Sequence, residues 1–227
     1  MSETRRNALI IGASRGLGLG LVRQHLARGW HVTATVRTPS DALAALGGEL
    51  EIETLDMDRR EQIEALAGRL QGRRFDLLFV NAGVSGPRET PIGDVPVEEI
   101  NRVFNTNAVS PIRLADRLYD LVAPDGTIAF MSSILGSVAA NTKGGTELYR
   151  ASKAALNTLA RSFVARHADA RRTVLSVHPG WVRTDMGGEG APLDVETSTR
   201  GMTDMLERRH GSGGHAFVDY RNQEIPW

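Results

Sequence analysis

Residues 8–20 read Ala-Leu-Ile-Ile-Gly-Ala-Ser-Arg-Gly-Leu-Gly-Leu-Gly, an apolar run that gives way to closely spaced glycines and then to a helical pattern of leucines. This pattern predicts a strand, a tight turn and a helix. Glycine lets the backbone turn sharply and approach a phosphate, whose charge the positive end of the helix attracts. The spacing, Gly12, Gly16 and Gly18, has one residue more between the first two glycines than the commoner dinucleotide motif. A loop of this kind alone is often an ordinary turn, but its place between strand and helix favours a nucleotide site.

A second pattern joins a tyrosine to a lysine. The chain has only two lysines among its 27 basic residues, and Lys153 follows Tyr149, one of three tyrosines, by four positions. If residues 147–168 are helical, both side chains lie on one face. Lowering the phenol pKa by about three units needs roughly 4 kcal/mol, and one cation at about 4 Å supplies that at an effective dielectric near 20. The ordinary alternative is a half-buried aromatic beside a solvated cation.

Together, the glycine loop and the Tyr-Lys pair resemble the short-chain dehydrogenase/reductase family, and the likeness extends over essentially the whole chain. Other segments that resemble family landmarks follow in the expected order: Asp56-Met57, Asn81-Ala82-Gly83, Asn107, Ser132-Ser133 and Pro179 to Thr184. The stretches around Ser133 and Tyr149, and the closing Ile225-Pro226-Trp227, are most similar to the C-factor and sniffer-like carbonyl reductase branch.

The resemblance implies a hydride transfer between a nicotinamide and a carbonyl carbon. In this mechanism Tyr149 gives a proton to the nascent alkoxide, and Lys153 depresses the phenol pKa and holds the nicotinamide ribose. Ser133 would donate to the substrate oxygen, and Asn107 would hold a water that links Lys153 to solvent. Two of these residues have ordinary alternatives, since Ser133 could cap a strand end and Asn107 could bend a helix. His178 ends a buried strand, and we interpret it as structural.

The same resemblance implies a cofactor site in which Asp56 meets the adenine amino group. Its expected members besides Tyr149 and Lys153 are Gly12, Ser14, Arg15, Gly16, Leu17, Gly18, Arg37, Asp56, Met57, Asn81, Ala82, Gly83, Pro179, Val182 and Thr184. Ile11 and Val80 depart from the residues usual in the family, Thr and Asn, which puts the rigidity of the supporting shell in doubt.

Arginines favour NADP over NAD as the cofactor. An NAD site places an acid about 20 residues after the glycine loop, whereas the 2′-phosphate of NADP needs cations there. Residues 33–37 contain no acid and end in Arg37, while Arg15 matches the other basic position of NADP-dependent members. Two guanidiniums can bind a phosphate through bidentate hydrogen bonds. The alternative, with NAD as second choice, is that both are ordinary surface arginines.

Apolar runs alternate with amphipathic segments along the chain, which predicts a parallel sheet covered by helices on both faces. We expect one α/β domain over residues 1–227, a doubly wound Rossmann fold with strand order 3-2-1-4-5-6-7. The expected strands are 7–11, 31–36, 51–55, 76–80, 126–131, 173–178 and 215–218. The expected helices are 17–28, 40–46, 59–70, 96–121, 147–168 and 194–209.

Composition narrows the function. The chain has no cysteine, 27 acidic and 27 basic residues, and no long apolar run. These features argue against a disulfide framework, a metal centre, a nucleic-acid surface and a membrane span. We therefore expect a cytoplasmic protein. Family likeness also implies a homodimer or homotetramer that pairs through helices beginning near residues 105 and 147.

The irregular stretches 84–95 and 184–193 follow strands, so we expect them on the ligand side, and the second is short enough to suggest an open substrate site. Candidate pocket residues are mostly apolar, which predicts a hydrophobic or aromatic carbonyl substrate: Val84, Ile134, Leu135, Ser137, Trp181 and Met186. A nucleotide-binding signalling protein of the C-factor type is the alternative. A sugar-nucleotide epimerase would need a large substrate domain, for which no room follows residue 186.

Overall fold

The computed structural model describes residues 5–167 and 171–227 and is built around one parallel seven-stranded sheet. Its order is β3-β2-β1-β4-β5-β6-β7, so the predicted α/β fold and strand order are confirmed. The strands are β1 (Asn7–Ile11), β2 (His31–Val36), β3 (Leu50–Thr54), β4 (Phe75–Val80), β5 (Val122–Met131), β6 (Thr173–His178) and β7 (His215–Asp219).

The central strand β1 shows why its residues form a buried strand. Successive side chains of a strand point to opposite faces, so Leu9 and Ile11 enter the core on one side of the sheet, while Ala8 and Ile10 enter the core on the other. Both faces are therefore apolar, as expected of a parallel sheet covered on both sides.

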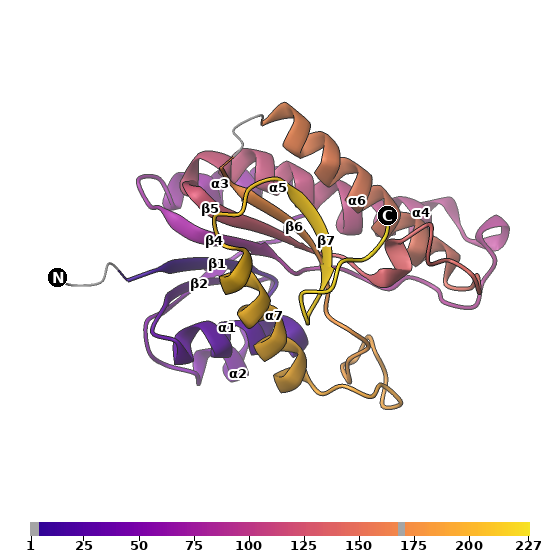
Figure 1. Ribbon diagram of the computed structural model, residues 1–227, viewed down its shortest axis with the longest axis horizontal. Coiled ribbons are helices and arrows are strands. Elements are labelled where there is room, and N and C mark those ends of the chain that lie inside the picture. The colour runs from indigo at the N-terminus through magenta and orange to yellow at the C-terminus, as the bar shows by residue number, and fades with distance from the viewer. Residues whose placement is uncertain (1–4, 168–170) are drawn as a thin grey trace.

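Helices cover the two faces in separate layers (Figure 1). One layer holds α1 (Gly16–Ala27), α2 (Asp41–Ala44) and α7 (Val195–Arg209). The other holds α3 (Arg60–Arg69), α4 (Val97–Phe104), α5 (Ser110–Leu118) and α6 (Glu147–Arg166). Sheet order reverses between β1 and β4, which opens the crevice at their carboxyl ends where such folds bind ligands.

Gly20, the last glycine of the opening motif, serves helix packing rather than the loop. A Cβ built on it would lie 2.7 Å from both Thr199 Cγ2 and Val195 Cγ1 of α7. The missing side chain thus lets α1 lie directly against α7.

Two predicted helices differ from those observed. The helix expected over 96–121 is interrupted: α4 ends at Phe104, a π-helical turn spans Asn105–Val109, and α5 continues from Ser110. The helix expected over 40–46 is the single turn α2. Strand β5 begins at Val122, four residues before its expected start, and the remaining boundaries agree within two residues. Residue 168, the expected end of the helix from 147, lies outside the described residues.

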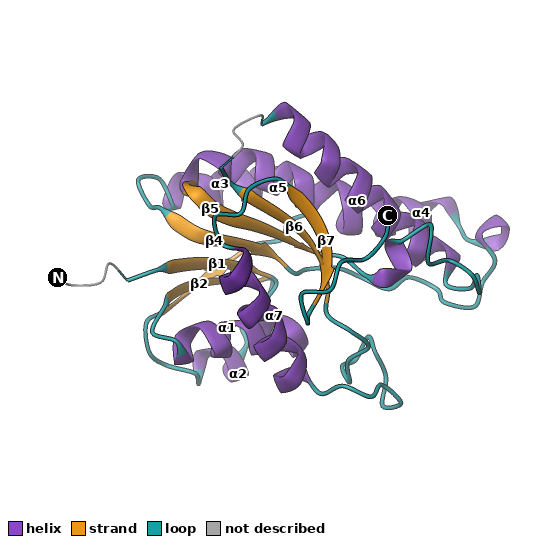
Figure 2. Cartoon of the chain, in the orientation of Figure 1, coloured by secondary structure: helices purple, strands orange, loops and turns teal. Residues whose placement is uncertain are grey.

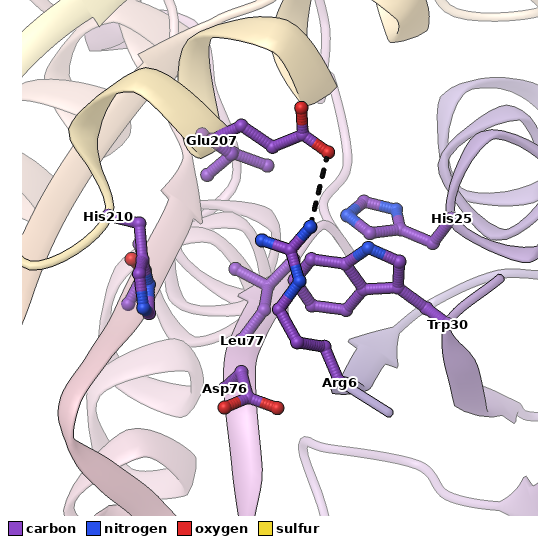
Figure 3. A pocket seen from close by; sticks show the side chains of 9 residues that line it. Arg6, His25, Trp30, Asp76, Leu77, Glu207 and His210 are labelled. Carbon is purple, nitrogen blue, oxygen red and sulfur yellow. Dashed lines mark ion pairs between the residues drawn. The ribbon is translucent and has the colours of Figure 1, made fainter. Parts of the chain in front are cut away.

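Long loops gather at the carboxyl edge of the sheet (Figure 2). At the opposite, amino-terminal edge lies a cavity of about 10 Å³, enough for one water molecule (Figure 3). Two buried polar atoms among its lining residues, Trp30 Nε1 and Thr127 Oγ1, have no hydrogen-bond partner in the described structure. Because the strands separate this cavity from the carboxyl edge, it lies away from the predicted site.

Candidate active site

The glycine loop can close only because two of its residues lack a side chain. Gly12 has φ +83°, and a Cβ on it would lie 2.8 Å from Ala82 Cβ. A Cβ on Gly18 would lie 2.1 Å from the Gly12 carbonyl oxygen. Asn81 Nδ2 donates to that same oxygen at 2.7 Å. The Asn81-Ala82-Gly83 segment thus contacts the glycine loop directly.

Hydroxyl groups from neighbouring segments hold the loop in place. Thr35 Oγ1 on β2 accepts a hydrogen bond from Gly12 N at 3.1 Å, and Ser40 Oγ donates to the Ser14 carbonyl at 2.8 Å. Ile11 and Val80, the two departures from the family pattern, are buried core residues. Position 11 offers no hydroxyl, and the hydroxyl that supports the loop next to it comes from Thr35 on the adjacent strand.

The two arginines expected to bind a 2′-phosphate both lie in exposed positions on this side of the sheet. Arg15 is the N-cap residue of α1, and its guanidinium forms an ion pair with Asp185 at 2.8 Å. Arg37 directly follows β2 and is exposed. The segment that it begins is tied to the glycine loop through the Ser40–Ser14 bond.

Tyr149 and Lys153 lie one turn apart on α6, as the spacing predicts. Lys153 is buried, with 2% of its surface exposed, whereas Tyr149 is half-buried. Lys153 Nζ lies 5.7 Å from the centre of the Tyr149 ring and donates to the Met131 carbonyl at 2.8 Å. The ordinary alternative of a solvated helix cation is therefore wrong.

Burial changes the expected acidity of this pair. Dense packing raises the pKa of Tyr149 to about 12, although the nearby charge of Arg88 and a hydrogen bond with Ser133 lower it. Burial also lowers the pKa of Lys153 to about 8. The groups that lower the phenol pKa are Arg88 and Ser133 and not Lys153, whose ammonium is itself desolvated and donates to the Met131 carbonyl.

Close packing against α6 brings Ser133 to Tyr149. Ser133 lies two residues after the end of β5 and caps the short turn Ile134–Gly136, where its Oγ accepts from Leu135 N at 3.1 Å. A Cβ on Gly136 would lie 2.8 Å from the Lys153 carbonyl carbon, so glycine is required for this approach. Ser133 is therefore both the cap of the turn that follows β5 and the hydrogen-bond partner of Tyr149.

Asn107 lies in the π-helical turn and clamps the chain after β4. Its Oδ1 accepts from Val84 N and its Nδ2 donates to the Val84 carbonyl, both at 2.8 Å. The same Nδ2 donates to Ser152 Oγ at 3.0 Å, which links the clamp to α6. The side-chain amide thus forms its hydrogen bonds with other groups of the protein, as the helix-bending alternative predicts. Single π-helical turns such as this one are frequent at functional sites.

Beyond the end of β3, two acids have different surroundings. The Asp56 carboxylate accepts from Asp58 N at 3.1 Å and is half-buried. Asp58 accepts three side-chain hydrogen bonds, from Asn105, Thr106 and Ser110, and so anchors the interrupted helix. The Met57 side chain packs in the core, and only its main chain is available to a ligand.

The segment after β6 turns back along the same edge. Ser198 Oγ on α7 donates to the Pro179 carbonyl at 2.7 Å, and Val182 is buried. Thr184 Oγ1 accepts from Gly187 N at 3.0 Å, and its Cγ2 lies 3.5 Å from the position of a Cβ on Gly16. This segment and the glycine loop therefore face each other across the crevice.

Three of the six predicted pocket residues are exposed around the opening of the site, and Val84 and Leu135 are half-buried. Trp181 is 59% exposed, Ile134 41% and Met186 38%, which agrees with an open substrate site. Ser137 is an exception, because it is buried and donates to the Pro226 carbonyl. It therefore holds the C-terminal segment instead of lining the pocket.

His178, at the end of β6, has a ring nitrogen, Nδ1, that is buried without a partner in the described structure, and burial lowers its pKa to about 4. Its neutral imidazole agrees with a structural role.

Several site residues carry no signal in the sequence alone. Asn157 of α6 accepts from Ser132 Oγ at 2.8 Å and donates to the Gly136 carbonyl at 3.4 Å, which fixes the segment that carries Ser133. Asp58 and Arg88 are further examples. Their roles depend on contacts between distant segments, so a homologue alignment or a structure is needed to find them.

The geometry fits a dinucleotide. Gly16 has φ +53° at the start of α1, and outside its chain neighbours and the backbone of α1 a built Cβ would meet only Thr184 among the described residues, at 3.5 and 3.9 Å. Gly83 leaves space between Asn107 Oδ1 and Lys153 Nζ, which a Cβ would meet at 3.2 and 3.4 Å.

Within residues 5–167 and 171–227 we find no cluster of metal-ligating side chains and no helix able to cross a membrane.

Comparison with known proteins gives one family. The family model described as short chain dehydrogenase matches residues 6–192. A curated relative, the C-signal of Myxococcus xanthus, is 38% identical over 154 residues, which are 67% of this chain and 92% of that protein.

Solved structures agree in fold over the full length. A Burkholderia multivorans protein described as a short-chain dehydrogenase/reductase, with bound NADP, has a TM-score of 0.96, 46% identity, and coverage of 99% of this chain and 100% of that one. A carbonyl reductase from Pseudomonas aeruginosa PAO1 in complex with NADP has a TM-score of 0.92 and 43% identity, with the same coverage. The carbonyl reductase Sniffer of D. melanogaster has a TM-score of 0.86 and 34% identity, again with 99% and 100% coverage.

Proposed function

The chain belongs to the short-chain dehydrogenase/reductase family of oxidoreductases, in its C-factor and sniffer-like branch, and from this membership we propose that it reduces the carbonyl group of a small, largely apolar substrate with NADPH. The single observation that carries the proposal is the meeting of Ser133, Tyr149 and Lys153 beside a glycine loop shaped for a dinucleotide. Two similar structures that contain NADP support the choice of cofactor.

The bound cofactor would supply the hydride to the carbonyl carbon. Tyr149 then donates the phenolic proton to the carbonyl oxygen, which takes the electron pair of the broken C=O π bond. The raised pKa keeps this phenol protonated at neutral pH, the state that carbonyl reduction requires. Oxidation of an alcohol would need the phenolate, so we propose that reduction is the favoured direction near pH 7.

Ser133 and Lys153 would support this proton transfer in different ways. The Ser133 hydroxyl, already hydrogen-bonded with the phenol, is placed to donate to the same substrate oxygen. The Lys153 ammonium would exchange the Met131 carbonyl for the nicotinamide ribose and bring its charge to the phenol. Asn107 would order this end of the site through the Val84 main chain, and we propose that the proton returns through a water held at the π-turn.

Arg37 gives a prediction about the cofactor. Replacing Arg37 with Asp should reverse the preference from NADPH to NADH, because a carboxylate repels a 2′-phosphate and accepts from a 2′-hydroxyl. We expect the ratio of kcat/KM for NADPH to that for NADH to fall by about 10²-fold, which corresponds to about 2.7 kcal/mol. Equal or better kinetics of the unaltered protein with NADH would contradict the roles assigned to Arg15 and Arg37.

The likeness to C-signal supports one alternative, an NADP-binding signalling protein with little turnover. Assay of NADPH oxidation against a panel of ketones, aldehydes and quinones separates the two functions. Saturable turnover with at least one carbonyl supports the reductase. Tight NADPH binding without turnover across the panel would favour the signalling protein.

A further inference from the structure

Arg88 connects the two loops that flank the substrate side of the site. Its carbonyl accepts from Thr146 N at 3.2 Å, three residues before Tyr149. Its side chain crosses to the other loop, where Nη2 donates to the Met186 carbonyl. The guanidinium thus lies at the opening of the site, joined to residues 98 positions away in the chain.

The charge of Arg88 is not neutralised by a carboxylate within the described parts of the chain. The acids next in sequence to Met186 and Thr146 have other partners: Asp185 pairs with Arg15 at 2.8 Å, and the Glu147 carboxylate accepts from Ile92 N at 2.8 Å. Arg88 is exposed, yet its charge acts on the Tyr149 phenol. A guanidinium has five N–H donors, so the bond to Met186 leaves donors for a ligand.

An exposed aromatic ring is hydrogen-bonded to the same turn, Met186-Gly187, that the Arg88 side chain binds. Trp181, 59% exposed, donates from Nε1 to the Gly187 carbonyl at 2.8 Å. Gly187 directly follows Met186, whose carbonyl binds Arg88. The indole and the cation are therefore held by neighbouring carbonyls, one able to contact an aromatic ring and the other an anion on it.

We propose that Arg88 determines specificity by binding an anionic group, such as a carboxylate, of an aromatic carbonyl substrate whose reactive C=O lies at Tyr149. The proposal rests on the carbonyl reductase function and deepens it. Arg88 is not the proton donor, and its proposed contribution is selection of the negatively charged substrate over a neutral one of the same shape.

A pair of aldehydes that differ in charge tests the proposal. We expect the unaltered enzyme to show a higher kcat/KM for 4-carboxybenzaldehyde than for its neutral methyl ester. The substitution Arg88→Gln should lower the ratio of the two kcat/KM values by about tenfold, as expected for loss of a charge-assisted bond. Arg88→Lys, which keeps the charge, should retain much of the preference. Any effect of Arg88 on the Tyr149 proton is common to both substrates and cancels in the ratio.

Lys143, an exposed cation on the neighbouring loop, provides the matched control. Lys143→Gln removes the same charge and should leave the ratio within about twofold of that of the unaltered enzyme, because an exposed charge at a distance is screened. An unchanged ratio in Arg88→Gln, or an equal fall in Lys143→Gln, would overturn the proposal.

Binding of the product to the NADP complex separates this proposal from the proposed function. By calorimetry, 4-(hydroxymethyl)benzoate should bind the unaltered protein at least about fivefold more tightly than it binds Arg88→Gln, while its methyl ester binds both equally. Charge-selective binding without turnover would leave the anion site standing and contradict the reductase function. Turnover without charge selectivity, or no selective binding, would overturn the anion site.

Discussion

Replacing Tyr149 with Phe is expected to lower kcat by about 10²–10⁴-fold while leaving NADPH affinity nearly unchanged. Phe keeps the aromatic ring at this position of α6 and removes only the hydroxyl, which is the proposed proton donor and the partner of Ser133. Turnover is measured from NADPH absorbance at saturating carbonyl, and affinity from quenching of protein fluorescence. Because the half-buried ring remains, we expect little change in stability.

Tyr119→Phe is the control for this result. It also removes a phenolic hydroxyl, but from a tyrosine in the layer of helices outside the site, where its ring stacks on His167 with 3.8 Å between the ring centroids. We expect near-normal turnover in this variant. Tyr149→Phe with more than about a tenth of normal kcat would mean that another group delivers the proton, and the assignment of Tyr149 would be wrong.

Replacing Lys153 with Arg should reduce kcat/KM by at least about tenfold, or about 1.4 kcal/mol of transition-state stabilisation. The substitution keeps the charge, but Lys153 is buried and its Nζ donates to the Met131 carbonyl at 2.8 Å, a space that the larger planar guanidinium does not fit. An arginine would therefore neither reach the Met131 carbonyl in the same geometry nor meet the ribose and the phenol together.

The pH profile separates this role of Lys153 from a general loss of packing. With a pKa of about 8, Lys153 is charged below that pH and neutral above it. Since the charged form is the active one, kcat/KM for NADPH, which reports the free enzyme, should fall as the pH rises through about 8. In Lys153→Arg the guanidinium does not titrate in this range, so the fall in kcat/KM should move to higher pH.

Lys143 allows the same change at the other lysine of the chain. Lys143→Arg alters an exposed side chain and should leave both kcat/KM and the pH profile unchanged. Normal kinetics and an unmoved profile in Lys153→Arg would show that this buried lysine takes no part in the chemistry.

The sequence predicted the fold because its signals were local. Buried apolar runs and the glycines at 12 and 18 specify a strand, turn and helix without reference to distant residues, and alternation of such units leaves few possible topologies. The interrupted helix was missed because its cause is distant. Asn107 is hydrogen-bonded to Val84, and the Asp58 carboxylate accepts three hydrogen bonds from the interrupted region. These tertiary contacts interrupt a helix that the local sequence pattern predicts as continuous.

The sequence named candidate site residues, but it gave little of their electrostatics. Spacing on α6 placed Tyr149 beside Lys153, but the direction of the phenol pKa shift depends on burial, which spacing does not give. Arg88 carried no recognisable pattern, since its influence arises where two loops meet.

The most direct test of the account is transfer of deuterium from NADPH labelled at C4 of the nicotinamide. We expect an aldehyde or ketone reduced by the protein to acquire the deuterium on its carbinol carbon, detected by mass spectrometry as a gain of about one mass unit, and the transfer to be abolished in Tyr149→Phe within the limits of its residual rate. Oxidation of NADPH without labelled alcohol, or equal transfer by Tyr149→Phe, would contradict carbonyl reduction at this site.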